Sequence, residues 1–232
     1  MCFSTVASLT SGAGLAAIGI ASVAAVPARR EMLFAGIPLL FGVHQLMEGG
    51  LWLALHRGDA AMTSCMTAGF SMIAQVAWPV IAPLAVWLVE PPGWRRQAIA
   101  VCVAAGVLIA AILLYGQATD FSPAEIRNGH IFYGFPHYNW FRDAQLLLPA
   151  LALYVIATCG GSLLSSDRLI PLFGAAVPLS LIATAAIFET WLVSVWCFFA
   201  ALLSAIVFTW AMRRRRTAAG AWLELTPPAR TS

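Results

Sequence analysis

QAIAVCVAAGVLIAAILLYG, which occupies residues 97–116, contains no charged side chain and directly follows Arg95 and Arg96. The hydrocarbon core of a bilayer is about 30 Å thick, and a helix needs roughly 20 apolar residues to cross it. A soluble core helix is rarely apolar over such a length, and the basic pair is typical of a membrane flank. The stretch therefore predicts a membrane-spanning helix.

The whole chain has the same character as this stretch. Of its 232 residues, 61% are hydrophobic and 10% are charged. A soluble domain has about 45–50% apolar and about 25% charged residues. The composition thus excludes a water-soluble globule, a disordered chain and a collagen-like chain.

Further apolar runs of similar length lie on both sides of residues 97–116. The predicted fold is an all-α, polytopic membrane bundle of seven transmembrane helices. This bundle fills residues 1–216, contains a long aromatic loop at 117–143, and is followed by a short tail at 217–232. The predicted spans are residues 8–27, 33–55, 63–89, 97–116, 144–164, 169–187 and 191–212.

The orientation of the bundle follows from its arginines, which supply all 13 basic residues. Cytoplasmic flanks of membrane helices carry an excess of positive charge. With the N-terminus outside and the C-terminus in the cytoplasm, three arginines lie outside: Arg57, Arg127 and Arg142. Ten lie inside, which favours this orientation: Arg29, Arg30, Arg95, Arg96, Arg168, Arg213, Arg214, Arg215, Arg216 and Arg230.

The arginine pattern also predicts partners. We expect the lipid bilayer as the main partner, with anionic lipid at the run Arg213, Arg214, Arg215 and Arg216, because the basic residues flank apolar runs. The same pattern is not that of a nucleic-acid interface. The absence of lysine excludes a retinal Schiff base, which needs a lysine amine.

Ionisable groups at membrane depth are costly, so each is a candidate functional residue. His44 and Glu48 are four residues apart and are expected on one helix face, with Trp52 one turn further on. Gln75 is expected at a depth similar to that of His44. These residues predict an outward-facing polar pocket, to which Glu189 and His137 contribute from the outer loops.

The sequence is compatible with three functions for this pocket and the chain that contains it. It binds or conducts a proton, a cation or a small polar ligand; it is the site of a membrane-embedded, metal-dependent enzyme; or the chain is an accessory subunit of a membrane complex. A metal would be held by His44, Glu48, Glu189 and His137, although no HExxH spacing is present. An intramembrane His–Glu pair also serves simply to hold helices together. The sequence leaves the cofactor and the oligomeric state open.

Several motifs resemble those of a known family. They are Met1-Cys2-Phe3-Ser4, Leu40-Phe41-Gly42 with Gln45, Glu48-Gly49 with Trp52, Trp78-Pro79, Phe135-Pro136-His137 and Ser194-Val195-Trp196-Cys197-Phe198-Phe199-Ala200. Together they resemble a bacterial family of multi-pass membrane proteins of unknown function whose members begin Met-Cys-Phe-Ser. The resemblance implies a bacterial inner-membrane protein. It also implies that glutamine often replaces His44, which gives Glu48 the greater weight.

Overall fold

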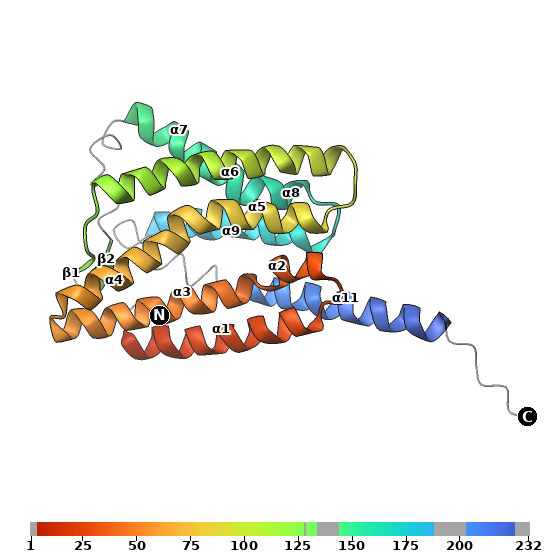
Figure 1. Ribbon diagram of the computed structural model, residues 1–232, viewed down its shortest axis with the longest axis horizontal. Helices are drawn as coiled ribbons and strands as arrows, with labels where there is room; N and C mark the ends of the chain where they lie inside the picture. The colour runs from red at the N-terminus through yellow and green to blue at the C-terminus, as the bar shows by residue number, and fades with distance from the viewer. Residues whose placement is uncertain (1–3, 128, 134–143, 188–202, 226–232) are drawn as a thin grey trace, which may run out of the picture.

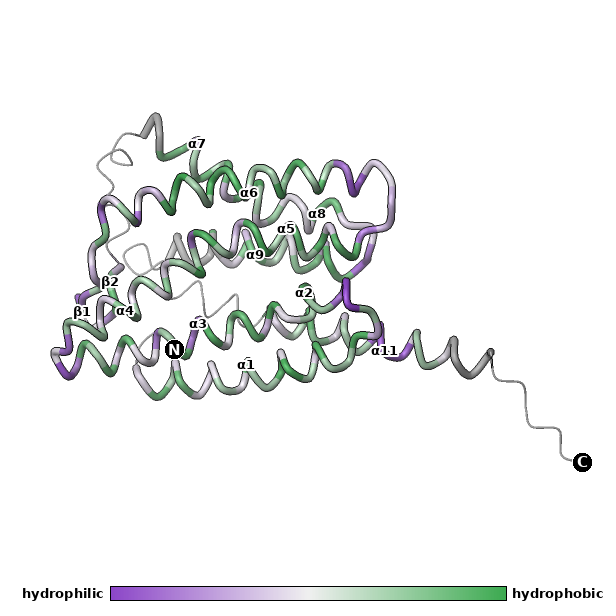
Figure 2. Tube along the Cα trace, in the orientation of Figure 1, coloured by the Kyte–Doolittle hydropathy of each residue, from purple (hydrophilic) through white to green (hydrophobic). Residues whose placement is uncertain are grey.

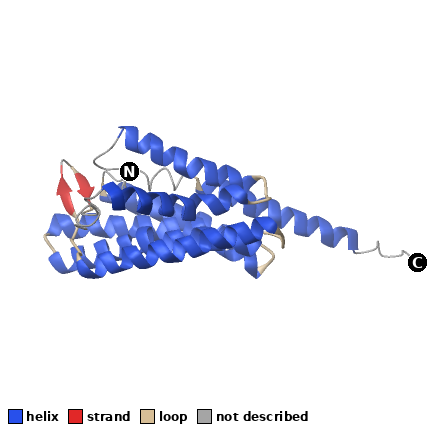
Figure 3. Ribbon diagram, turned by 90° about the horizontal axis from the view of Figure 1, so that it is seen from above, coloured by secondary structure: helices blue, strands red, loops and turns tan. Residues whose placement is uncertain are grey.

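The computed structural model describes residues 4–127, 129–133, 144–187 and 203–225. Long helices run back and forth along a common axis (Figure 1). A small hairpin lies at one end of this bundle, and the last helix leaves it at the other end (Figure 3). The predicted helical membrane bundle is thus confirmed in its general character.

The elements follow one another with few long connections. Their bounds are α1 Thr5–Ala25, η1 Arg29–Glu31, α2 Met32–Ala35, α3 Ile37–Arg57, α4 Ala60–Ser71, η2 Met72–Ala77, α5 Trp78–Val89, α6 Trp94–Thr119, β1 Glu125–Arg127, β2 His130–Phe132, α7 Ala144–Val155, η5 Ile156–Gly160, α8 Gly161–Leu164, α9 Leu169–Ile187 and α11 Ser204–Leu225. Of these, η1 is a 3₁₀ turn, whereas η2 and η5 are π-helical.

Five helical segments in the described ranges are long and apolar enough to cross a membrane: Thr5–Ala25, Arg29–Arg57, Ala60–Val89, Trp94–Thr119 and Leu147–Leu164. They coincide with the first five predicted spans. The sixth predicted span matches α9, of which Leu169–Ser180 is counted as an apolar helix shorter than a full span within the described side chains. The seventh lies partly outside the described residues and ends in α11. The count of seven and the orientation remain predictions.

Small residues let α1 and α3 pack closely side by side. A Cβ atom added at Gly42 would lie 2.6 Å from the backbone nitrogen of Ala16, and one at Gly12 would lie 2.8 Å from Leu46. Glycine allows this approach because it has no side chain. Gly14, which belongs to the same small-residue stretch, has open space around its Cβ position instead. The α1–α3 pair is therefore fixed at one face of α1.

The third span is interrupted where η2 meets α5. The Trp78 amide donates to the carbonyl of Ile73, five residues back, rather than to that of Ala74. The next residue, Pro79, has no N–H that could donate to the Ala74 carbonyl in place of the Trp78 amide. The Ala74 carbonyl is thus released from the helix, and the Tyr154 hydroxyl of α7 donates to it at 2.7 Å. A neighbouring helix thereby satisfies a carbonyl that would otherwise be unpaired in the membrane interior.

Tyr154→Phe is expected to lower the free energy of unfolding by about 1–3 kcal/mol, because it leaves the Ala74 carbonyl buried without a donor. Thermal unfolding of the detergent-solubilised protein measures the change. Tyr115→Phe is the matched control, because Tyr115 is 67% exposed. Equal unfolding temperatures for Tyr154→Phe and the wild type would show that this bond does not stabilise the bundle.

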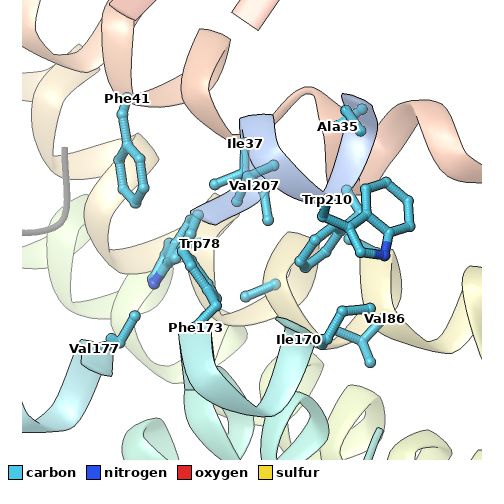
Figure 4. Packing of buried hydrophobic residues seen from close by; sticks show 14 of the residues in the cluster. Ala35, Ile37, Phe41, Trp78, Val86, Ile170, Phe173, Val177, Val207 and Trp210 are labelled. Carbon is cyan, nitrogen blue, oxygen red and sulfur yellow. The ribbon is translucent and has the colours of Figure 1, made fainter. Parts of the chain in front are cut away.

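The largest buried apolar cluster joins the first helices to the last (Figure 4). The Phe34 ring packs edge-on against Trp210, with 4.9 Å between ring centroids, and against Phe173 at 6.0 Å. Val207 is also fully buried here. The α2 region, α9 and α11 are therefore held together by one core.

Polar residues gather at the two ends of the bundle, whereas the helices between them are mainly apolar (Figure 2). One end contains the α1–α3 turn, the α5–α6 turn, the α8–α9 turn and the point where α11 leaves (Figure 1). These segments carry Arg29, Arg30, Arg95, Arg96, Arg168 and Arg213–Arg216. Arg57 and Arg127 lie at the other end. The excess of arginine that the sequence gives to one set of connecting segments is therefore an excess at one end of the bundle.

Two segments are more ordered than the sequence suggests. The region predicted as the 117–143 loop begins with the end of α6 and then forms the antiparallel hairpin of β1 and β2. Tyr133, which follows β2 in the predicted aromatic loop, is only 6% exposed. In the tail expected at 217–232, α11 continues as far as Leu225.

Candidate functional site

Glu48 is a fully buried carboxylate in the second half of α3. Its exposed fraction is 0%, and the Ser8 hydroxyl of α1 donates to its Oε2 at 3.4 Å. The contact depends on the close packing of the two helices, since a Cβ at neighbouring Gly49 would lie only 2.5 Å from Leu9. The first helix therefore brings a neutral hydroxyl to the carboxylate.

Gln45 and Trp52 lie on the same side of α3 as Glu48, because positions 45, 48 and 52 follow the helical period. The Ser11 hydroxyl donates to Oε1 of Gln45 at 3.4 Å. The Nε2 group of Gln45 and the indole N–H of Trp52 are buried and have no acceptor within the described parts of the chain. Each is a donor that would bind an acceptor atom, and leaving it unpaired costs about 1–3 kcal/mol.

His44 faces α4. Its Nε2 lies 3.1 Å from the Phe70 carbonyl, and its ring stacks on the Phe70 ring with 3.8 Å between centroids. A carbonyl oxygen only accepts, so Nε2 carries the proton. The Phe70 ring stacks in turn on Tyr133 at 4.3 Å. His44 and Glu48, expected on one face, thus contact α4 and α1 respectively.

Gln75 is part of the π-helical segment η2. It is 8% exposed, and its Oε1 accepts a hydrogen bond of 2.8 Å from Nε2 of Gln117 in α6. Gln75 is therefore joined to α6 by this bond. Gln117 could not be identified from the sequence because it lies just beyond the predicted span 97–116, in the predicted loop; the structure extends α6 to Thr119 and so includes it.

The hairpin covers the end of the bundle near Trp52. The Ala124 amide donates to the Thr67 hydroxyl of α4 at 3.1 Å. Ile131 and Tyr133 pack with Trp52 and Phe70 in a second buried apolar cluster. The indole of Trp52 also stacks on the ring of His56, at 5.4 Å between centroids.

Two of the predicted site residues, Glu189 and His137, lie outside the described residues. Within the parts of the chain that the structure describes, no three His, Cys, Asp or Glu side chains are grouped so that they could hold a metal ion. The metal set of His44, Glu48, Glu189 and His137 stays a prediction. In the described region, His44 and Glu48 contribute to two different helix contacts rather than to one centre.

Sequence reasoning also missed the buried acids at the arginine-rich end. Glu90 accepts hydrogen bonds from the Ser165 hydroxyl at 2.8 Å and from the Ser166 amide at 3.0 Å. Arg95 donates to the Leu164 carbonyl at 2.9 Å. These bonds join the α5–α6 turn to the α8–α9 turn. The signal in the sequence was a glutamate at the end of an apolar run, which is unusual in a lipid-facing position.

The model of a family of unknown function, DUF6629, matches residues 1–221. The chain belongs to this family. No curated protein matches the chain. No solved structure matches it either. Membership in an uncharacterised family agrees with the motif resemblance, whereas the bacterial origin and the Met-Cys-Phe-Ser opening of family members remain predictions.

The match extends over every membrane-spanning segment described above, from α1 to most of α11. The site residues Glu48, Gln45, Trp52, His44 and Gln75 all lie within it. DUF6629 is a family of unknown function, so the chemistry of these residues is the guide to what the protein does.

Proposed function

We propose that this member of DUF6629 is a membrane protein that binds or conducts a proton, a small cation or a small polar ligand at Glu48. The observation that supports this most strongly is the complete burial of a carboxylate within an apolar helix segment. Placing an acidic side chain at the centre of a membrane helix costs about 2.5–3.5 kcal/mol. Such residues commonly mark ion or substrate pathways.

The groups around Glu48 suit a small polar occupant. Ser8 and Ser11 supply hydroxyl oxygens from α1, and Gln45 supplies an amide oxygen. The N–H groups of Gln45 and Trp52 offer hydrogen bonds to an acceptor such as water. A hydrated proton or a small cation would bind to these oxygen atoms. The water that accompanies it would accept hydrogen bonds from the N–H groups.

We further propose that this site opens outward in the inner membrane of a bacterium. The arginine asymmetry favours an external position for the hairpin end, and Trp52 packs against that hairpin. His44, Gln75, Glu189 and His137 are proposed as the residues that surround the path from this side.

Glu48→Gln is expected to reduce ion flux at least tenfold, because the amide keeps the size of the side chain and the contact with Ser8 but neither ionises nor carries a negative charge. Flux is measured in proteoliposomes with a pH-sensitive dye inside, and then with dyes that report Na⁺ and K⁺. Glu125→Gln is the matched control, because the Glu125 side chain is 55% exposed in the hairpin. Flux through Glu48→Gln equal to that of the wild type would contradict the conduction of a proton or cation at Glu48.

A further inference from the structure

A partly buried ion pair holds the middle of α11 against the turn between α1 and α3. Glu31 is 1% exposed, and Nε of Arg214 donates to its Oε1 at 2.8 Å. Nη2 of Arg214 bonds to the same oxygen. The Arg214 guanidinium also lies over the ring of Trp210, 5.8 Å from its centroid. Two segments 183 residues apart are thereby joined.

This ion pair brings two sets of exposed arginines together. Arg29 and Arg30 immediately precede Glu31, and Arg213, Arg215 and Arg216 surround Arg214. All five are exposed, and none of the five forms an ion pair with a carboxylate of the described residues. We call them the arginine cluster. Arg214 is not counted in the arginine cluster, because it forms an ion pair with Glu31.

The two other acids with described side chains at this end of the bundle, Glu90 and Asp167, already have donors. Glu90 accepts from Ser165 and Ser166. Asp167 accepts from the Trp210 indole at 3.1 Å and from the Leu169 amide at 2.9 Å. The positive charge of the cluster therefore remains available for an anion from outside the chain.

The position of the cluster indicates which anion this is. The cluster lies where the apolar helix α1 has ended at Ala25 and before α3 begins at Ile37, on the segment where α11 leaves the bundle (Figure 1). This is the level at which lipid phosphates lie beside a membrane-spanning bundle. Guanidinium groups bind phosphate oxygens through two parallel hydrogen bonds.

We propose that the arginine cluster is a binding site for the headgroup of an anionic phospholipid. Both arms of the cluster contact the lipid, and the Glu31–Arg214 pair keeps them together. The site is independent of Glu48, which lies in the second half of α3, away from the α1–α3 turn that carries Arg29 and Arg30. Either proposal can therefore fail without the other.

The test uses the full-length protein in a neutral detergent, with native mass spectrometry to count bound lipid and to obtain its dissociation constant. Phosphatidylglycerol, phosphatidylcholine with the same acyl chains and inorganic phosphate are the three probes. We expect phosphatidylglycerol to bind at least tenfold more tightly than phosphatidylcholine. R213Q/R215Q/R216Q and, separately, R29Q/R30Q are each expected to weaken phosphatidylglycerol binding at least tenfold.

R57Q/R127Q, at the other end of the bundle, is the matched control and is expected to leave binding unchanged. Thermal unfolding of each variant shows that it is folded, and the two arms of the cluster serve as independent tests. Unchanged phosphatidylglycerol binding in a folded cluster variant would overturn the proposal. So would equal binding of phosphatidylcholine. Competition by inorganic phosphate at the concentration of the lipid would identify a soluble phosphate as the occupant and would also overturn it.

Discussion

Gly106→Leu is expected to prevent the accumulation of folded protein. Gly106 of α6 lies directly against the carbonyl oxygen of Pro79 in α5, so that a Cβ at position 106 would overlap this oxygen. The Pro79 carbonyl would normally bond the amide of residue 83, but Pro83 has no N–H. Glycine at 106 therefore lets α6 cover a carbonyl that α5 leaves without its helical partner.

The clash at Gly106 involves backbone, which cannot move aside by a change of rotamer. Overpacking in a close-packed interior costs about 1–3 kcal/mol and sometimes more, and the expected cost here is at the upper end or above it. The fraction of monodisperse protein after extraction and its thermal unfolding temperature measure the effect. Ala104→Leu is the matched control, because Ala104 is exposed on the same helix. Similar behaviour of both variants would contradict this packing of α5 and α6.

Arg214→Ala is the second substitution with a large expected effect. It removes the partner of Glu31, whose side chain is 1% exposed, and so leaves a carboxylate buried without its cation. Removing one partner of a buried ion pair costs about 3–5 kcal/mol. Because the Arg214 side chain is itself 38% exposed, the lower part of this range is expected. Thermal unfolding in a detergent free of anionic lipid measures the loss.

Arg213→Ala is the control for Arg214→Ala, since the neighbouring arginine is exposed and forms no ion pair with a described residue. Adding Glu31→Gln to Arg214→Ala is expected to recover part of the lost stability, because the remaining buried side chain is then neutral. Equal losses for Arg213→Ala and Arg214→Ala would show that charge at this end, rather than the contact with Glu31, stabilises the bundle.

The membrane-spanning segments could be predicted because uninterrupted apolar length is a local property of the sequence. Glu48 and Gln75 could be identified for the same reason, since a polar side chain within an apolar run is visible without any structure. The neighbours of these residues could not be predicted. His44 and Glu48 differ by only about 40° around α3, yet this is enough to direct one toward α4 and the other toward α1.

Contacts between segments that are far apart in the sequence could not be predicted either. The release of the Ala74 carbonyl depends on the π-helical bonding before Trp78, and its donor, Tyr154, comes from a helix 80 residues further on. Likewise, Arg214 belongs to a run that predicts only a cytoplasmic flank. Its pairing with Glu31 depends on how α11 lies against η1, which no local pattern encodes.

The core shared by α2 and α11 has a consequence for biosynthesis. Phe34 leaves the ribosome well before Val207 and Trp210, which lie in the distant helix α11 and pack in the same core. Until α11 has been made, the aromatic surface around Phe34 and Phe173 lacks its cover and is available to other apolar helices. We therefore expect nascent chains that stop before Ser204 to be recognised by membrane quality control.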